Sequence, residues 1–129
     1  MSTTLIRKFI DACWCGDVET AERMIEDGFV PVPEHEGEPS PLLIAIEEEK
    51  LDMANVILRG NVDVNYSDDM GTTALQAAAC IGNQGLVFML ISRGAKNKKD
   101  FTGRSASDYA RLNGFEDIAK IIEGCAKAC

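Results

Sequence analysis

The side chains of this chain that could carry out chemistry are one histidine and five cysteines. A Ser–His or Cys–His catalytic site needs a base packed beside its nucleophile. His35 is the only imidazole, and it lies in an acidic connector between Pro31 and Pro41, where we expect an exposed hairpin. The sequence contains no phosphate-binding glycine loop and no dinucleotide-binding fingerprint. It therefore predicts a protein that is not an enzyme and that uses no cofactor.

The cysteines are possible metal ligands. Cys13 and Cys15 flank Trp14, and Cys125 and Cys129 stand near the C-terminus. Zinc sites need two close pairs of ligands or a Cys/His set. The repeat described below assigns Cys13 to the core and Cys15 to the surface, so their thiols should face different ways. We predict no metal site. A redox protein remains an alternative that thiol titration would test, with Cys129 as the candidate reactive thiol.

Composition and charge exclude several classes of partner. The chain has 129 residues, of which 46% are hydrophobic and 26% charged, as expected for one globular domain. Its net charge of −8 repels nucleic-acid phosphates and anionic lipid. No run approaches the roughly 18 apolar residues of a membrane span, and the start does not resemble a secretory signal. The odd cysteine count favours a reducing compartment. We expect an intracellular, cytoplasmic protein, with a nuclear location also open, that binds neither nucleic acid nor membrane.

The elements that position these residues follow from an internal repeat. Four segments align at spacings of 33, 33 and 32 residues, and one column contains only alanine: Ala12, Ala45, Ala78 and Ala110. A residue this small lets two helices pack closely. Gly16, Gly82 and Gly114 suit tight turns with positive φ between two helices. Each repeat is therefore a helix, a turn, a second helix and a polar connector, and one repeat cannot bury its apolar face alone.

This pattern resembles the ankyrin repeat, which begins Gly-x-Thr-Pro-Leu-His-x-Ala. The match runs from Gly71 to Ala78, with a shorter match from Ser40 to Ala45. The family's ending, Gly-Ala-Asp-Val-Asn, is represented by Asn61 to Asn65. The resemblance implies an all-α repeat (solenoid) of four stacked helix-turn-helix repeats with short β-hairpin connectors. We predict one domain over 1–129, with repeats at 5–36, 37–70, 71–102 and 103–124 and a frayed C-terminal end at 125–129.

Two positions depart from the pattern. Ser107 stands where a core leucine is expected. A terminal repeat tolerates a polar residue near solvent, whereas a buried serine there would forgo roughly 1.5–3 kcal/mol of burial. Glu49 stands where the turn expects glycine, and a left-handed glutamate costs about 1–2 kcal/mol. The alternative is that this turn takes another shape, and we expect it to be the least regular.

The resemblance also implies where a partner would bind. Ankyrin-repeat proteins usually contact partners through hairpin tips and the concave surface of the first helices. Carried over position by position, this gives the predicted partner-binding residues: Trp14, Cys15, Glu36, Glu47, Glu48, Asp69, Met70, Thr72, Cys80, Ile81, Phe101, Thr102, Arg104 and Leu112. They combine an apolar strip with acidic neighbours, so a partner with apolar anchors and a basic flank would suit them.

Several of these positions have a structural alternative. Trp14 could instead fold back over the end of the core, and Phe101 could pack under the last hairpin. Ile81 could contact neighbours along the stack. A glutamate run such as Glu47 to Glu49 is commonly a solvated face.

The function we predict is protein–protein interaction, as a regulator or adaptor that occupies a partner's surface. We expect a monomer, because terminal repeats close the stack. The alternative is a fixed structural or assembly subunit of a larger complex, which would be unstable when purified alone. Asn65 also resembles the setting in which ankyrin asparagines are hydroxylated, although leucine is usual where Ile57 stands.

Overall fold

The computed structural model describes residues 3–33 and 35–128, and the side chains of residues 4–33 and 35–124. Over this range the chain forms helices and no strand. It divides into two compact parts, which we call the N-terminal half (Met1–Asp63) and the C-terminal half (Val64–Cys129). Each half contains two helix pairs.

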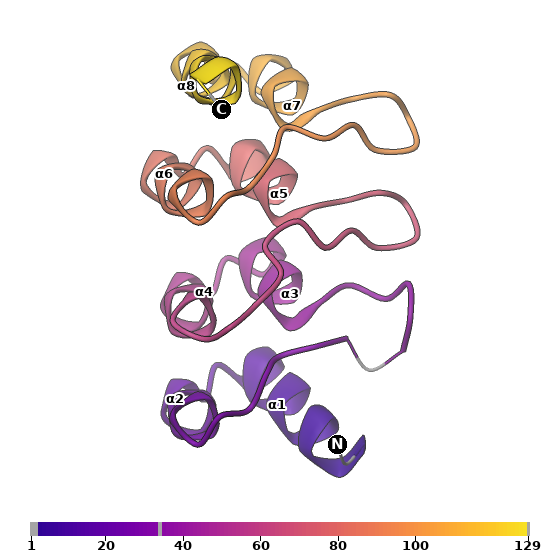
Figure 1. Ribbon diagram of the computed structural model, residues 1–129, viewed down its shortest axis with the longest axis vertical. Helices are drawn as coiled ribbons and strands as arrows, with labels where there is room; N and C mark the ends of the chain where they lie inside the picture. Colours follow the sequence, from indigo (N-terminus) through magenta and orange to yellow (C-terminus); the bar gives the residue numbers. More distant parts are fainter. Residues whose placement is uncertain (1–2, 34, 129) are drawn as a thin grey trace. The chain divides into compact units, whose positions relative to one another are not determined.

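The N-terminal half is built from two helix pairs that pack on each other. Helix α1 contacts α2 and α3, and α4 contacts α2 and α3 (Figure 1). The ring of Phe9 stacks on that of Phe29 with 5.1 Å between centroids, and Ile46 and Met53 are also fully buried in this half. The four helices are α1 (Thr3–Cys15), α2 (Val18–Glu26), α3 (Pro41–Glu47) and α4 (Leu51–Leu58).

The C-terminal half repeats this arrangement. Helix α5 contacts α6 and α7, and α8 contacts α6 and α7 (Figure 1). Leu75, Leu90 and Ile122 are fully buried in its core. The helices are α5 (Ala74–Ile81), α6 (Gln84–Ser92), α7 (Ala106–Leu112) and α8 (Glu116–Ala128). The all-α repeat fold expected from the sequence is confirmed.

The alanine column lies where each first helix packs. Ala45, Ala78 and Ala110 are 0% exposed and Ala12 is 6% exposed. A larger side chain at these positions would force the neighbouring helices apart or require repacking. The burial of the whole column supports the inference that small residues are needed at these positions.

The turn between the two helices has the same form in every repeat. Gly16, Gly82 and Gly114 have φ of 76°, 76° and 83°, and Glu49 has φ of 56°. In each turn the backbone N–H after the left-handed residue donates to the carbonyl oxygen of the column alanine: Asp17 to Ala12 (2.9 Å), Lys50 to Ala45 (2.8 Å), Asn83 to Ala78 (3.3 Å) and Phe115 to Ala110 (2.7 Å). The expectation of an irregular backbone at Glu49 is wrong, because Glu49 adopts the same left-handed conformation as the turn glycines and is followed by the same hydrogen bond.

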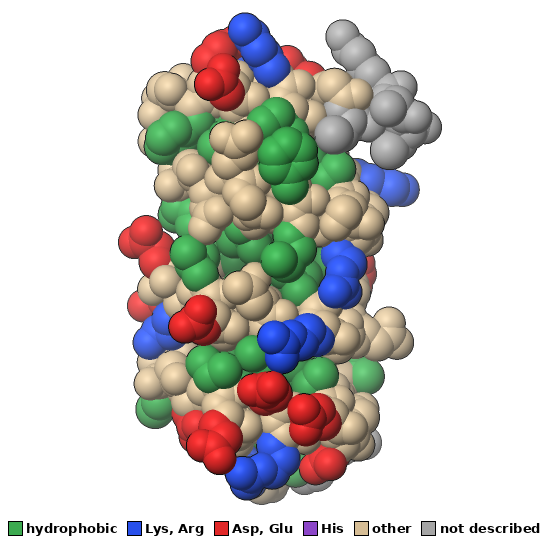
Figure 2. Space-filling view, turned by 90° about the vertical axis from the view of Figure 1, so that its left-hand side faces the viewer, with side chains coloured by type: hydrophobic (Ala, Val, Ile, Leu, Met, Phe, Trp, Pro, Cys, Tyr) green, Lys and Arg blue, Asp and Glu red, His purple; other side chains and the backbone are tan. Residues whose placement is uncertain are grey.

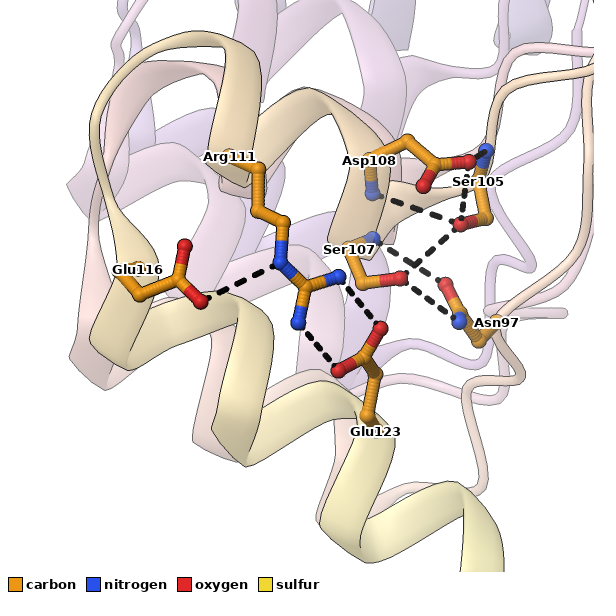
Figure 3. Close-up of polar contacts among 7 residues, drawn as sticks. All are labelled: Asn97, Ser105, Ser107, Asp108, Arg111, Glu116 and Glu123. Atoms are coloured by element: carbon orange, nitrogen blue, oxygen red, sulfur yellow. Dashed lines mark hydrogen bonds and ion pairs between the residues drawn. The ribbon is translucent and has the colours of Figure 1, made fainter.

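Ser107 is 2% exposed, so the alternative in which it lies near solvent is wrong. Its hydroxyl accepts a hydrogen bond from Asn97 Nδ2 at 3.1 Å and lies 3.0 Å from Ser105 Oγ, and its backbone N–H donates to Asn97 Oδ1 at 3.3 Å (Figure 3). A polar group can be buried when its hydrogen bonds are satisfied. This network offsets the apolar burial that serine forgoes.

The last helix, α8, continues to Ala128, into the segment 125–129 for which the sequence predicts a frayed end. Alanine and lysine, which make up residues 126–128, have high helix propensity, and no proline interrupts them. Ion pairs secure the helix to α7, because Arg111 donates to both Glu123 oxygens at 2.6 and 2.5 Å and to Glu116 at 3.3 Å (Figure 3). Cys129 lies outside the described residues.

Candidate protein-binding surfaces

A hollow lies along helix α1 within the N-terminal half, and we call it the α1–α3 groove. Arg7, Ile10, Asp11 and Trp14 form one wall. Their spacing of three, four and seven residues places them on one face of the helix. The other wall comes from α3, from the connector before it and from the residue directly after it. The volume is about 310 Å³, and these facing residues are Glu38, Pro39, Ile44, Glu47 and Glu48.

The floor of the groove is apolar. Ile10 and Ile44 are 8% and 9% exposed, so only small parts of them reach its surface. Trp14 is 50% exposed and lines the groove, so about half of its surface is open to solvent. Lys50 Nζ donates to the Trp14 carbonyl oxygen at 2.7 Å and so ties the end of α1 to the turn after α3.

The rim of the groove is acidic. Asp11, Glu38, Glu47 and Glu48 are exposed and surround it, against one cationic side chain, Arg7. Four carboxylates around an apolar floor give the site a negative potential and a preference for cations. The groove therefore unites Trp14, Glu47 and Glu48, three of the predicted partner-binding residues.

Most of the groove residues were missed by the sequence analysis. Arg7, Ile10 and Asp11 could have been found by counting back from Trp14 in helical steps. Glu38 and Pro39 carry no such signal, because the course of the connector brings them opposite α1. Two predicted residues of this half, Cys15 and Glu36, are exposed but do not line the groove.

Two hairpin loops form a second surface, in the C-terminal half, and an aspartate organises each. Asp68 Oδ1 accepts hydrogen bonds from the backbone N–H groups of Met70 and Thr72, both at 3.0 Å. Asp100 Oδ1 accepts from those of Thr102 and Arg104, at 2.9 and 3.2 Å. Each loop is closed by few backbone hydrogen bonds, so no strand forms there. Neither aspartate is among the predicted partner-binding residues, although the two lie 32 residues apart and so occupy equivalent positions of the repeat.

The tips of these two loops touch. The Phe101 N–H donates to the Met70 carbonyl oxygen at 3.1 Å, while Met70 is 61% and Phe101 79% exposed. The alternative in which Phe101 packs under the hairpin is therefore wrong. Of the other predicted loop residues, Asp69, Thr102 and Arg104 are exposed, and Thr72 is half-buried.

The pKa of Asp100 is lowered by the hydrogen bonds that its carboxylate accepts. The hydroxyl of Thr102 donates to Oδ1 at 2.6 Å, and that of Tyr109 donates to Oδ2. These hydrogen bonds favour the ionised carboxylate and lower the pKa of Asp100 to about 2. The same contact with the carboxylate raises the pKa of Tyr109. The loop is thus held by a carboxylate that stays ionised well into acid.

The remaining predicted residues lie at the ends of α5 and α7. Cys80 is exposed, Ile81 is half-buried and Leu112 is 62% exposed. The sequence analysis missed Phe88 on α6, which is 48% exposed. For the C-terminal half, Figure 2 shows hydrophobic side chains on the face formed by α6 and α8. Phe88 directly follows the buried residues Leu86 and Val87 in α6, so only packing reveals its exposure.

The groups considered first for chemistry are dispersed. Cys13 is buried, and burial raises the pKa of its thiol to about 12, whereas Cys15 and His35 are exposed. The described residues bring no three His, Cys, Asp or Glu side chains together in a way that could hold a metal ion. Within the same residues no helix is long and apolar enough to cross a membrane.

Comparison with known proteins identifies the family to which these helix pairs belong. Residues 9–100 and 42–127 match a family model described as ankyrin repeats in three copies. Potassium channel AKT1 of Oryza sativa subsp. indica is 37% identical over 76 residues, 58% of this chain and 8% of the channel. Ankyrin repeat and SAM domain-containing protein 6 of Mus musculus is 37% identical over 93 residues, 70% of this chain and 10% of that protein. Inversin of Danio rerio is 31% identical over 80 residues, 62% of this chain and 8% of inversin. The chain thus spans about a tenth or less of the length of these relatives.

Proposed function

Because the chain belongs to the ankyrin-repeat family, whose repeats are in general protein–protein interaction modules, we propose that it is a regulator or adaptor that acts by occupying the surface of a partner protein. The relatives named above are much longer proteins, so their own activities do not carry over to this chain. The proposal rests instead on the surfaces of the two halves.

One observation carries the proposal: large apolar side chains are exposed at the positions through which ankyrin repeats bind. Trp14, Met70, Phe101 and Leu112 are 50%, 61%, 79% and 62% exposed. Burying one such side chain contributes roughly 1.5–3 kcal/mol. A folded chain that leaves several of them in water has a candidate contact surface at each of them, and tryptophan is enriched among residues that dominate binding energy.

The compartment and oligomeric state form part of the proposal. Cys13 and Cys15 are free thiols, and Cys15 is exposed. Exposed free thiols are best preserved under reducing conditions, which supports an intracellular location. We expect the purified chain to be a monomer, and light scattering would test this.

The test is quantitative capture of partners from the source lysate. We compare the wild type with the variant Trp14→Ala/Phe101→Ala, using mass spectrometry to measure each captured protein. The matched control is Leu5→Ala/Phe88→Ala, which also removes two exposed apolar side chains but none of the predicted binding residues. All variants must keep the circular dichroism spectrum of the wild type.

We expect a partner that the wild type and the control capture and that the Trp14/Phe101 variant loses. The same partner should then bind purified protein with reduced affinity for that variant in calorimetry. Equal capture by all variants would contradict the proposed surfaces. A chain that is unstable alone, and stable only at a fixed ratio with other proteins, would instead support a structural subunit.

A further inference from the structure

We propose that the α1–α3 groove binds a basic peptide segment of a partner, with an arginine side chain lying against Trp14 between the carboxylates of Asp11 and Glu48. This inference rests on the proposed function, because it names the partner chemistry that one of its surfaces selects. The expected ligand is a cationic peptide segment with apolar residues beside the arginine.

The charge of the rim selects a cation. Among the side chains that line the groove, four are acidic and one is basic. Arg7, Glu38 and Glu47 already interact within the protein, so the attraction for a new cation is assigned to Asp11 and Glu48. These two residues are exposed on α1 and directly after α3, on opposite walls. A cation entering the groove would lie between two carboxylates.

The aromatic wall favours arginine among the cations. Trp14 is 50% exposed, so part of its indole surface is open to the groove. A guanidinium stacks on indole and keeps its N–H donors in plane, where they can reach carboxylates at the edge. Lysine would gain the charge interaction but not the planar stacking.

The floor fits the rest of such a segment. Ile10, Pro39 and Ile44 present apolar surface on which the methylene stem of arginine can pack. A volume of about 310 Å³ is at the small end of the roughly 300–1,000 Å³ range of small-molecule sites, which suits one or two side chains. The loop surface of the C-terminal half has exposed Met70 and Phe101 but adjoins Arg104 and Lys99, so it lacks this charge selectivity.

The experiment uses the fluorescence of Trp14, which is the only tryptophan in the chain. The probe is an acetylated and amidated pentapeptide of alternating leucine and arginine. The comparison peptide has citrulline at every arginine, because citrulline keeps the shape but is neutral. We expect saturable binding of the arginine peptide and affinity weaker by about tenfold for the citrulline peptide, from lost cation–π and charge interactions.

Variants locate the site. Asp11→Asn/Glu48→Gln should weaken the arginine peptide about fivefold and leave the citrulline peptide unchanged. The control Glu26→Gln/Asp27→Asn removes the same net charge at the exposed end of α2, away from the groove, and should change affinity less than twofold. Trp14→Ala should weaken the arginine peptide in calorimetry, with an unchanged circular dichroism spectrum.

Equal binding of the two peptides, or equal weakening by the groove and control variants, would overturn the inference. Failure of the arginine peptide to bind, with a lysate partner still lost in the Trp14/Phe101 variant, would overturn the inference and leave the proposed function intact. Peptide binding in the groove without any partner that depends on Trp14 or Phe101 would support the inference and contradict the proposed function.

Discussion

The Glu49 turn of the N-terminal half and the Gly82 turn of the C-terminal half share a backbone conformation but tolerate different residues. Both have positive φ, and both are followed by the same hydrogen bond to the column alanine. Glu49 is exposed. A Cβ atom at Gly82, in contrast, would lie 2.4 Å from the Phe115 ring. The comparison teaches that the backbone favours glycine in this turn, whereas a neighbouring side chain can make glycine obligatory.

The largest effect is expected from Gly82→Ala. A left-handed alanine costs about 1–2 kcal/mol, and overpacking against Phe115 adds about 1–3 kcal/mol. Gly114→Ala is the matched control, because Gly114 has φ of 83° and nothing within 4 Å of its Cβ position. Urea denaturation followed by circular dichroism should show the free energy of unfolding falling clearly further for Gly82→Ala. Equal losses would mean that Phe115 moves aside without cost.

A second contrast sets Ser107 against leucine at the equivalent position of the N-terminal half, Leu42. Both side chains are buried, at 2% and 3% exposed, but Ser107 depends on Asn97 for hydrogen bonds. Asn97→Ala should lower the free energy of unfolding by about 1–2 kcal/mol, because it removes partners of buried groups. Asn113→Ala removes an exposed amide that donates to the Tyr109 carbonyl oxygen, and it should cost less. Similar costs for the two variants would show that the network adds nothing.

A substitution in the Glu49 turn should raise the free energy of unfolding, unlike a substitution in the Gly82 turn. Glu49→Gly relieves a left-handed strain of about 1–2 kcal/mol but adds about 0.4–1 kcal/mol of unfolded-state entropy. The expected net gain in the free energy of unfolding is about 0.5–1 kcal/mol. Glu48→Gly is the control: Glu48 has φ of −86°, so glycine relieves no strain there and should destabilise. A loss for both variants would contradict the strain at Glu49.

The smallest effect concerns the Asp100 loop and depends on pH. The folded pKa of about 2 lies below the ordinary value of 3.8, so the folded state binds fewer protons than the unfolded state between these values. The stability that this carboxylate contributes is therefore fully present above about pH 4 and is lost as the pH falls towards 2. Denaturation of the wild type and Asp100→Asn from pH 6 to pH 2 should show a difference that shrinks over this window. A difference that is constant with pH would assign the effect to geometry instead of charge.

Much of the fold could be predicted because its signals are local and repeated. The alanine column and the turn glycines recur at nearly constant spacing. Each residue type reflects a requirement within its own repeat, for helix packing or for the turn conformation. The candidate sites were predicted less completely. Met70 and Leu112 are exposed as expected, whereas Arg7, Asp11 and Glu38 were absent from the predicted set.

The sequence by itself therefore determined the family, the helix pairs and the positions of the turns, since these depend on residue type at fixed spacing. Only the tertiary structure decided which side chains meet. It placed Trp14 in a groove, covered Ser107 with Asn97 and set Phe115 over Gly82. The physical reason is that exposure and hydrogen bonding depend on residues brought together by packing, and their distance along the chain is not periodic.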